Sequence, residues 1–234
     1  QCISGVMGDA IIAGLTDTDP VYVLRDRHKA PATVHHRPLE QKELRAFFAA
    51  LEKDPGEEQG RVAVYLALWS LCRPNEVTGA RTAEFKLDEM NWVIPAERMK
   101  KRTEHIVPLP RQAVAAIKRL IDYRPHRNVL ILNRADPRRP ASKTYLNRVV
   151  TRLGFKGFTA HGIRATGSTM LHDMGFRPEI IDRQLAHIER NKTRRSYNRA
   201  VYLEERREMM QKWADYLDAV IAGAKVTPIR KAAA

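Results

Sequence analysis

Residues 61–81 read RVAVYLALWSLCRPNEVTGAR, and this stretch decides the fold. Its first part, up to Cys72, is apolar on nearly all sides of a helix, which is typical of a helix buried at the centre of a domain. Arg73-Pro74 follows directly. Proline is tolerated in the first turn of a helix, because the N–H that it lacks has no helical partner there. We therefore predict a second helix from Pro74 to about Arg81, with Arg73 at the junction.

Outward from this stretch, the pattern predicts more helices and a small sheet. The segments NWVIP (91–95) and HIVPLP (105–110) alternate as strands, with the basic stretch Arg98–Thr103 between them. Amphipathic helices are expected at 39–53, 111–123, 142–153, 161–174, 178–185, 191–198 and 202–221. Their expected end signals are Ser142 and Thr159 as N-caps and Gly175 as a C-cap. The expected fold is mainly α with a small antiparallel β-sheet or hairpin, an α+β class.

We divide the chain into four parts. Residues 1–20 contain an apolar helical pattern that ends at the break signal TDTDP, as the end of a helical domain would. Residues 21–37 are basic, contain proline and have no clear period, which is typical of a linker. Residues 38–222 form a compact α-rich domain, and residues 223–234 form a short basic tail. Because the chain opens with Gln1 rather than Met, we expect it to be a fragment of a longer protein.

The charge of the chain indicates a polyanionic partner. Its net charge is +14 and its pI is near 10.1; an excess of this size suggests a polyanionic partner, most often nucleic acid, and the alternative is that it serves solubility alone. Cys2 and Cys72 form no CxxC pair, so neither a zinc site nor a disulfide framework is indicated, and we expect a reduced, intracellular setting. The longest apolar run is too short and interrupted to span a bilayer, so no membrane partner is expected.

Arg73 lies where two helices are expected to meet, which is a favourable place for an anion. Its planar guanidinium can bind two phosphate oxygens, and free N–H groups at the start of a helix add partial positive charge. Glu76, three residues on, can orient the arginine through a charge-assisted hydrogen bond. Taken alone, this motif is more often a structural Arg–Glu pair.

A second motif is His161-Gly-Ile-Arg164, in which the two side chains share one face of a helix. A histidine and an arginine so placed can combine proton transfer with a charge clamp on one phosphate. Patterns of four residues are common by chance, so this motif is also weak alone. Lys143, Arg148 and Arg152 share a face of a basic helix, but solvent exposure explains them equally well.

His187 and Tyr197 follow the helix expected at 178–185. A tyrosine hydroxyl is a poor nucleophile near neutral pH, but nearby cations favour its ionised form. The cations that flank Tyr197 are Arg194, Arg195 and Arg199. Tyr202 is the rival nucleophile. It begins the apolar face of the last helix, however, so core packing suits it better.

Read together and in order, these motifs resemble the catalytic domain of tyrosine recombinases, in particular the integrases of phages and genomic islands. The resemblance covers about residues 34–229. The positions that match its catalytic pattern are Arg73, Lys100, His161, Arg164, His187 and Tyr197, with Glu76 as a supporting residue. Lys100 is chosen because it lies eight residues before Pro108, the usual register of the hairpin lysine, and Lys101 is the second choice. The resemblance further implies that residues 1–20 end a truncated core-binding domain and that 38–222 is the catalytic domain.

The resemblance implies a metal-free reaction. Tyr197 would attack the phosphorus, giving a 3′-phosphotyrosyl intermediate and a free 5′-hydroxyl, so neither ATP nor a metal is needed. Arg73 and Arg164 would stabilise the non-bridging oxygens of the transition state. Lys100 would protonate the leaving oxygen, while His161 assists as a base and His187 donates a hydrogen bond.

The implied function is a site-specific recombinase that integrates or excises a mobile element. Its implied partners are double-stranded DNA at attachment sites and three further copies in a tetramer, with accessory DNA-bending or excision factors as candidates. A cytoplasmic, nucleoid-associated, bacterial or phage-encoded protein is expected, with no cofactor and no metal. The alternatives are a type IB topoisomerase-like enzyme and a sequence-specific DNA-binding protein with vestigial catalytic groups. A metal-dependent nuclease ranks last, because no set of carboxylates has ligand spacing.

Overall fold

The computed structural model describes residues 2–22, 36–187 and 202–224, and the chain divides into two compact units, Gln1–His35 and His36–Ala234. The described part of the first unit contains one helix, α1 (Cys2–Ile12), which lies within the apolar helical pattern noted in residues 1–20. Ile3, Val6, Ile12 and Leu15 of this unit are exposed. The assignment of the two units to a core-binding and a catalytic domain stays a prediction.

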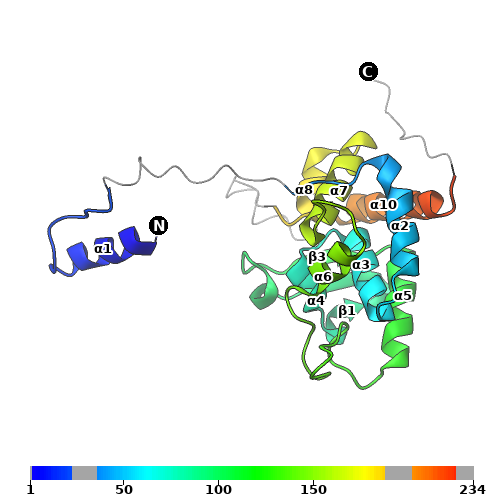
Figure 1. The fold of residues 1–234 in the computed structure, drawn as a ribbon, viewed down its shortest axis with the longest axis horizontal. Helices are drawn as coiled ribbons and strands as arrows, with labels where there is room; N and C mark the ends of the chain where they lie inside the picture. The colour runs from blue at the N-terminus through cyan, green and yellow to red at the C-terminus, as the bar shows by residue number, and fades with distance from the viewer. Residues whose placement is uncertain (1, 23–35, 188–201, 225–234) are drawn as a thin grey trace. The chain divides into compact units, whose positions relative to one another are not determined.

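The second unit is built around α3 (Glu58–Ser70), the helix predicted to be central. It contacts α4 (Pro74–Thr78), α5 (Arg111–Tyr123), α6 (Tyr145–Arg152), α7 (Ala160–Asp173) and α10 (Leu203–Ile221). Figure 1 shows α3 in the middle of this unit, with helices on several sides. Buried residues occur at almost every position of α3, and only Glu58, Arg61 and Tyr65, along one side of the helix, are exposed or half-buried. The other α-helices among the described residues of this unit are α2 (Gln41–Lys53) and α8 (Pro178–Gln184).

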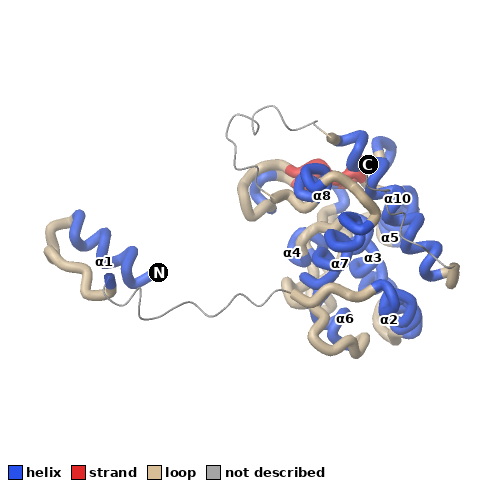
Figure 2. The backbone as a smooth tube through the Cα atoms, turned by 90° about the horizontal axis from the view of Figure 1, so that it is seen from above, coloured by secondary structure: helices blue, strands red, loops and turns tan. Residues whose placement is uncertain are grey.

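The sheet has three antiparallel strands in the order β1 (Phe85–Lys86), β2 (Asn91–Ile94) and β3 (His105–Pro108). In the β2–β3 pair, Trp92 faces Val107 and Ile94 faces His105. These side chains are all buried. Figure 2 shows the strands beside α8, and β3 also contacts α10. The predicted antiparallel hairpin is therefore confirmed.

Most helix boundaries agree with the sequence patterns to within a few residues. Gly175, with φ +80°, directly follows Met174, the C-cap residue of α7, so the predicted glycine at the end of this helix is confirmed. Thr159 is the N-cap residue of α7, as predicted. The prediction for Ser142 was wrong: α6 begins at Tyr145 with Thr144 as N-cap residue. The helix predicted at 191–198 lies outside the described residues. In the part of the chain that is described, no helix has both the length and the apolar character of a membrane span.

Candidate functional site

The junction between α3 and α4 fixes the position of Arg73. The α3 helix ends with Leu71 in the left-handed conformation, at φ 52°. The chain then turns so that Arg73 is the N-cap residue of α4 and Pro74 opens that helix. Leucine pays a steric cost of ~1 kcal/mol in this conformation, so the turn is held by its surroundings rather than by local preference.

Glu76 holds Arg73 from two sides. One carboxylate oxygen of Glu76 accepts the backbone N–H of Arg73 at 2.7 Å, and the other accepts Nη1 of its guanidinium at 2.8 Å. The Glu76 side chain is 4% exposed and that of Arg73 is 23% exposed. The hydrogen bond expected from the sequence is therefore present. It leaves the remaining donors of a partly exposed guanidinium for another acceptor.

Arg164 joins two helix ends. Its Nη1 donates to the carbonyl of Leu71 at the end of α3, and its Nη2 donates to the carbonyl of Leu185 at the end of α8, at 2.8 Å. A cation at the carbonyl end of a helix interacts favourably with the helix dipole. Burial lowers the pKa of Arg164 from its usual value, and the nearby Arg73 adds to this effect. Arg164 thus lies between the segments that carry Arg73 and His187.

Gly167 allows α7 to approach the end of α3 closely. A Cβ atom at this position would lie 2.3 Å from Cδ2 of Leu71, a fully buried side chain. Only glycine therefore fits here without a displacement of the Leu71 side chain or of the helices. The close approach brings the carbonyl of Leu71 within reach of Arg164, one turn earlier on α7.

His161 lies in the first turn of α7, on the same face as Arg164. Burial lowers its pKa, and the positive charges of His36, Arg164 and Arg73 lower it further. His161 precedes Arg164 by one turn of α7, and Arg164 donates to the carbonyl of Leu71, two residues before Arg73. The structure therefore brings together His161, Arg164 and Arg73, which the sequence places in separate motifs.

His187 is held at the end of α8 by a Schellman-type turn. The N–H of His187 donates to the carbonyl of Asp182 at 3.0 Å, and the N–H of Ala186 donates to that of Arg183 at 3.2 Å. Ala186 adopts φ 50° at the position where glycine is usual. Nδ1 of His187 lies 2.8 Å from the Asp182 carboxylate, which can only accept, so Nδ1 carries the proton of this contact and Nε2 is left for another partner.

Lys100 lies in the connection between β2 and β3, as predicted, and its side chain is exposed. Tyr197 lies outside the described residues. Tyr202, the alternative nucleophile, directly precedes α10, with φ 63°, and packs against the core. The guanidinium carbon of Arg177 lies over the Tyr202 ring, 5.4 Å from the centroid of that ring.

A buried polar network that the sequence did not reveal lies behind the site. Arg206, 1% exposed, donates from Nε to the side-chain oxygen of Gln184 at 3.0 Å and from Nη2 to the carbonyl of Ile106 at 2.7 Å. Gln184 in turn donates to the carbonyl of Ser70 at 2.7 Å, and Nε2 of His105 donates to the carbonyl of Gln184 at 3.1 Å. The network ties β3 and α10 to the ends of α3 and α8.

Burial lowers the pKa values of both ionisable groups of this network, Arg206 and His105. It lowers the pKa of Arg206 to about 9 and that of His105 to about 3, with the neighbouring arginine charge adding to the shift in the histidine. His105 is therefore neutral. One sequence signal pointed to Arg206: it is a charged residue on the apolar face that Met209, Trp213 and Leu217 continue.

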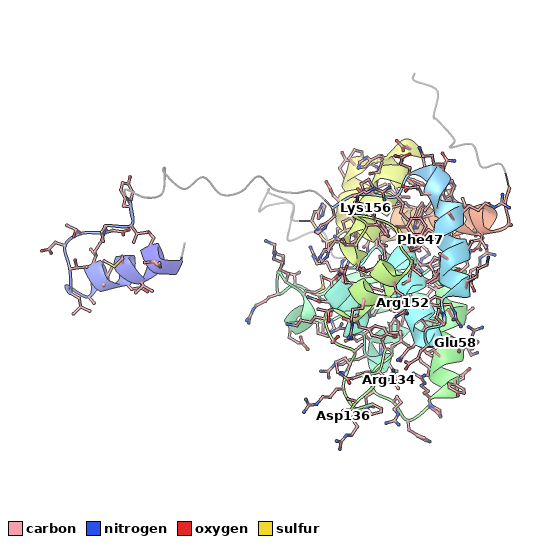
Figure 3. The ribbon with its side chains drawn as sticks, in the orientation of Figure 1. Phe47, Glu58, Arg134, Asp136, Arg152 and Lys156 are labelled. Carbon is pink, nitrogen blue, oxygen red and sulfur yellow. The ribbon has the colours of Figure 1, made fainter. Side chains whose placement is uncertain are left out.

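Arg152, labelled in Figure 3, has a structural partner. Its Nε and Nη2 each donate to one oxygen of the buried Asp54, both at 2.6 Å. This bidentate pair joins α6 to the end of α2. Arg148, on the same helix, donates to Ser142. The basic face noted in the sequence is thus partly committed to contacts within the protein.

The described residues contain no group of three or more His, Cys, Asp or Glu side chains that could hold a metal ion. What the site offers instead is a set of donors. Two guanidinium groups and two imidazoles lie at the ends of α3 and α8 and the start of α7. Such an arrangement can bind the oxygens of a phosphodiester and stabilise additional negative charge on them.

Comparisons with known proteins agree with this geometry. Residues 37–204 match the model of the phage integrase family. The prophage integrase IntA of Escherichia coli (strain K12) is 32% identical over 227 residues, which cover 97% of this chain and 55% of that protein. The chain spans about half the length of the curated relatives it matches.

Solved integrases share the fold. The integrase from mycobacterium phage Brujita superposes with a TM-score of 0.62 at 18% identity, covering 94% of this chain and 74% of that one. A lambda integrase tetramer bound to a Holliday junction gives a TM-score of 0.61 at 18% identity, covering 82% and 56% of the two chains. The expected mainly α fold with its small sheet is confirmed by these similarities.

Proposed function

Because the chain belongs to the phage integrase family, we propose that it carries the catalytic part of a site-specific recombinase that cleaves and rejoins DNA strands through a phosphotyrosine. The observation that carries this proposal is the convergence of Arg73, His161 and Arg164. They come from two distant motifs and lie where the ends of α3 and α8 meet the start of α7, with Arg164 bound to the carbonyls of Leu71 and Leu185.

The proposed cleavage step uses these groups in defined roles. The phenolic oxygen of Tyr197 forms a bond to the phosphorus while the bond from phosphorus to the 5′-oxygen breaks. His161 accepts the phenolic proton, and Lys100 gives a proton to the leaving oxygen. Both roles need transient proximity only, which suits a lysine on an exposed hairpin.

Arg73 and Arg164 stabilise the negative charge of the transition state in this proposal. The transition state carries more negative charge on its non-bridging oxygens than the ground state does. Guanidinium groups fixed in advance by Glu76 and by the carbonyls of Leu71 and Leu185 need little reorganisation to meet that charge. His187, with Nδ1 committed to Asp182, can donate only after protonation of Nε2, or accept through it. Rejoining is the reverse step, with a 5′-hydroxyl as the attacking group.

Double-stranded DNA at attachment sites is the proposed substrate, and a tetramer on DNA the proposed active assembly. The net charge of +14 supports a nucleic-acid partner. The lambda integrase with which the chain shares its fold is a tetramer on a Holliday junction, which supports the assembly. Integration or excision of a mobile element follows as the proposed outcome, with accessory DNA-bending or excision factors as further proposed partners. A nucleoid-associated location in the cell belongs to the same proposal.

A covalent adduct tests the proposal. The protein is incubated in EDTA with a duplex that carries a nicked attachment site, and a protein–DNA adduct that survives SDS is sought. We expect an adduct with the wild type and with Tyr202→Phe, and none with Tyr197→Phe. Tyr202 is the matched control because its ring is packed against the core. Tight, salt-sensitive binding without an adduct would favour a DNA-binding function, and cleavage only with added metal would overturn the mechanism.

A further inference from the structure

The segment from His36 to Glu40 lies along the first two turns of α7. The N–H of Leu39 donates to the side-chain hydroxyl of Thr166 at 2.8 Å, and both groups are buried. The carbonyl oxygen of Arg37 lies so close to Gly162 that a Cβ atom there would be 2.5 Å from it. These contacts, at successive positions of the segment and the helix, fix the segment on α7.

The segment is also fixed at its other end. The N–H of Glu40 donates to Glu43 at 2.9 Å, and the same carboxylate pairs with the guanidinium of Arg37. Both ends of the short stretch are thereby tied to helices α2 and α7.

At the start of this segment, the ring of His36 stacks on the ring of His161. The ring centroids are 4.8 Å apart and the planes differ by 18°. Nδ1 of His36 also lies 3.3 Å from the hydroxyl of Thr159, the N-cap residue of α7. A flat ring against one face of the His161 imidazole restricts its rotation about χ2, because other orientations would collide with the stacked ring.

We propose that His36 is a positioning residue for strand cleavage, whose ring holds the imidazole of His161 in the orientation that faces the reacting phosphate beside Arg73 and Arg164. This inference rests on the proposed function. It assigns no contact with DNA to His36, which acts through His161. The stacked ring, rather than a charge on it, is the property that matters.

Three variants test the proposal in the intact protein. His36→Ala removes the stacked ring, His36→Phe keeps a flat ring without nitrogen atoms, and His126→Ala is a matched control at an exposed histidine after α5. The measurement is the single-turnover rate of adduct formation on the nicked duplex, with DNA affinity measured in parallel. We expect His36→Ala to slow cleavage about tenfold, less than the ~10²–10⁴-fold of a lost acid–base group. His36→Phe should stay within about twofold of the wild type, with affinity unchanged throughout.

A second set of variants shows whether His36 acts through His161. In a His161→Ala background, the additional change His36→Ala should have no further effect on the rate, because the ring that it positions is gone. A wild-type rate in His36→Ala, an equally slow His36→Phe, or a tenfold loss that persists without His161 would overturn the inference. If the wild type forms no adduct at all, the proposed function fails instead, so the two failures are distinguishable.

Discussion

Replacing Glu76 with glutamine should break one of the two hydrogen bonds by which this carboxylate holds the backbone and the guanidinium of Arg73. Both of its oxygens accept hydrogen bonds from Arg73, one from the backbone and one from the guanidinium, at 2.7 and 2.8 Å. Glutamine has the same shape but only one acceptor, and its NH₂ group is a donor. Whichever way the amide turns, a donor must face one of the two Arg73 donors.

The expected decrease in the free energy of unfolding follows from these contacts. One charge-assisted hydrogen bond is lost, at ~1.5–3 kcal/mol, and a donor is left facing a donor in a buried place, at ~1–3 kcal/mol. The guanidinium of Arg73 is partly exposed and can turn toward water, so the total should be near the lower end, about 3 kcal/mol. With a denaturant slope of ~2 kcal/mol/M, this corresponds to a urea midpoint lowered by about 1.5 M. A displaced Arg73 should also slow cleavage by about 10²-fold.

Glu43→Gln is the matched control for stability. Glu43 accepts the backbone N–H of Glu40 and pairs with Arg37, but it is 21% exposed and its arginine is 39% exposed. We expect a loss of about 1 kcal/mol in the same urea experiment. Cleavage by Glu76→Gln is measured without urea, where the variant is still folded. Equal losses of stability in the two glutamine variants, or an unchanged cleavage rate in Glu76→Gln, would refute the reasoning.

Three further changes have predictable effects. Ala186→Gly relieves a left-handed alanine and should leave urea stability within ~1 kcal/mol of the wild type, whereas Ala186→Val should lower it by about 1–2 kcal/mol and slow cleavage. Asp54→Asn should cost about 2 kcal/mol at pH 7 by urea unfolding, since it weakens the pair with Arg152. Because hydrogen bonding to Arg152 lowers the Asp54 pKa below 3.8, this stability is present above that pH, and the difference between wild type and variant should shrink as pH falls below it. Gly167→Ala should displace Leu71 and slow adduct formation, while the added helix propensity of ~1 kcal/mol offsets much of the packing strain in thermal unfolding.

The local patterns predicted the elements and the arginine junction well. Proline after Arg73 restricts the backbone enough to place a helix start there, and the uniform apolarity of 61–72 is explained by helices on several sides of α3. The antiparallel hairpin followed from alternation in both strands. These features depend on residues close in sequence, so a single sequence carries them.

The contacts that shape the site could not be read from the sequence in the same way. Arg164 is held by the backbone carbonyls of Leu71 and Leu185, and any residue supplies a carbonyl. Ala186 ends α8 in a conformation for which glycine is the usual signal, because two backbone hydrogen bonds and the His187 contact compensate for its cost. The stack of His36 on His161 joins residues 125 positions apart, which only the tertiary fold brings together.

The buried guanidinium of Arg206 affects how specifically α10 packs against the rest of the domain. Placing a cation in the interior without a carboxylate partner lowers stability relative to an apolar residue of the same size. Acceptors that offset this cost are the side-chain oxygen of Gln184 and the carbonyl of Ile106. If α10 were rotated or shifted by one turn, the charge would face apolar side chains at a cost of several kcal/mol. These contacts therefore favour the observed register of α10 against β3 and α8.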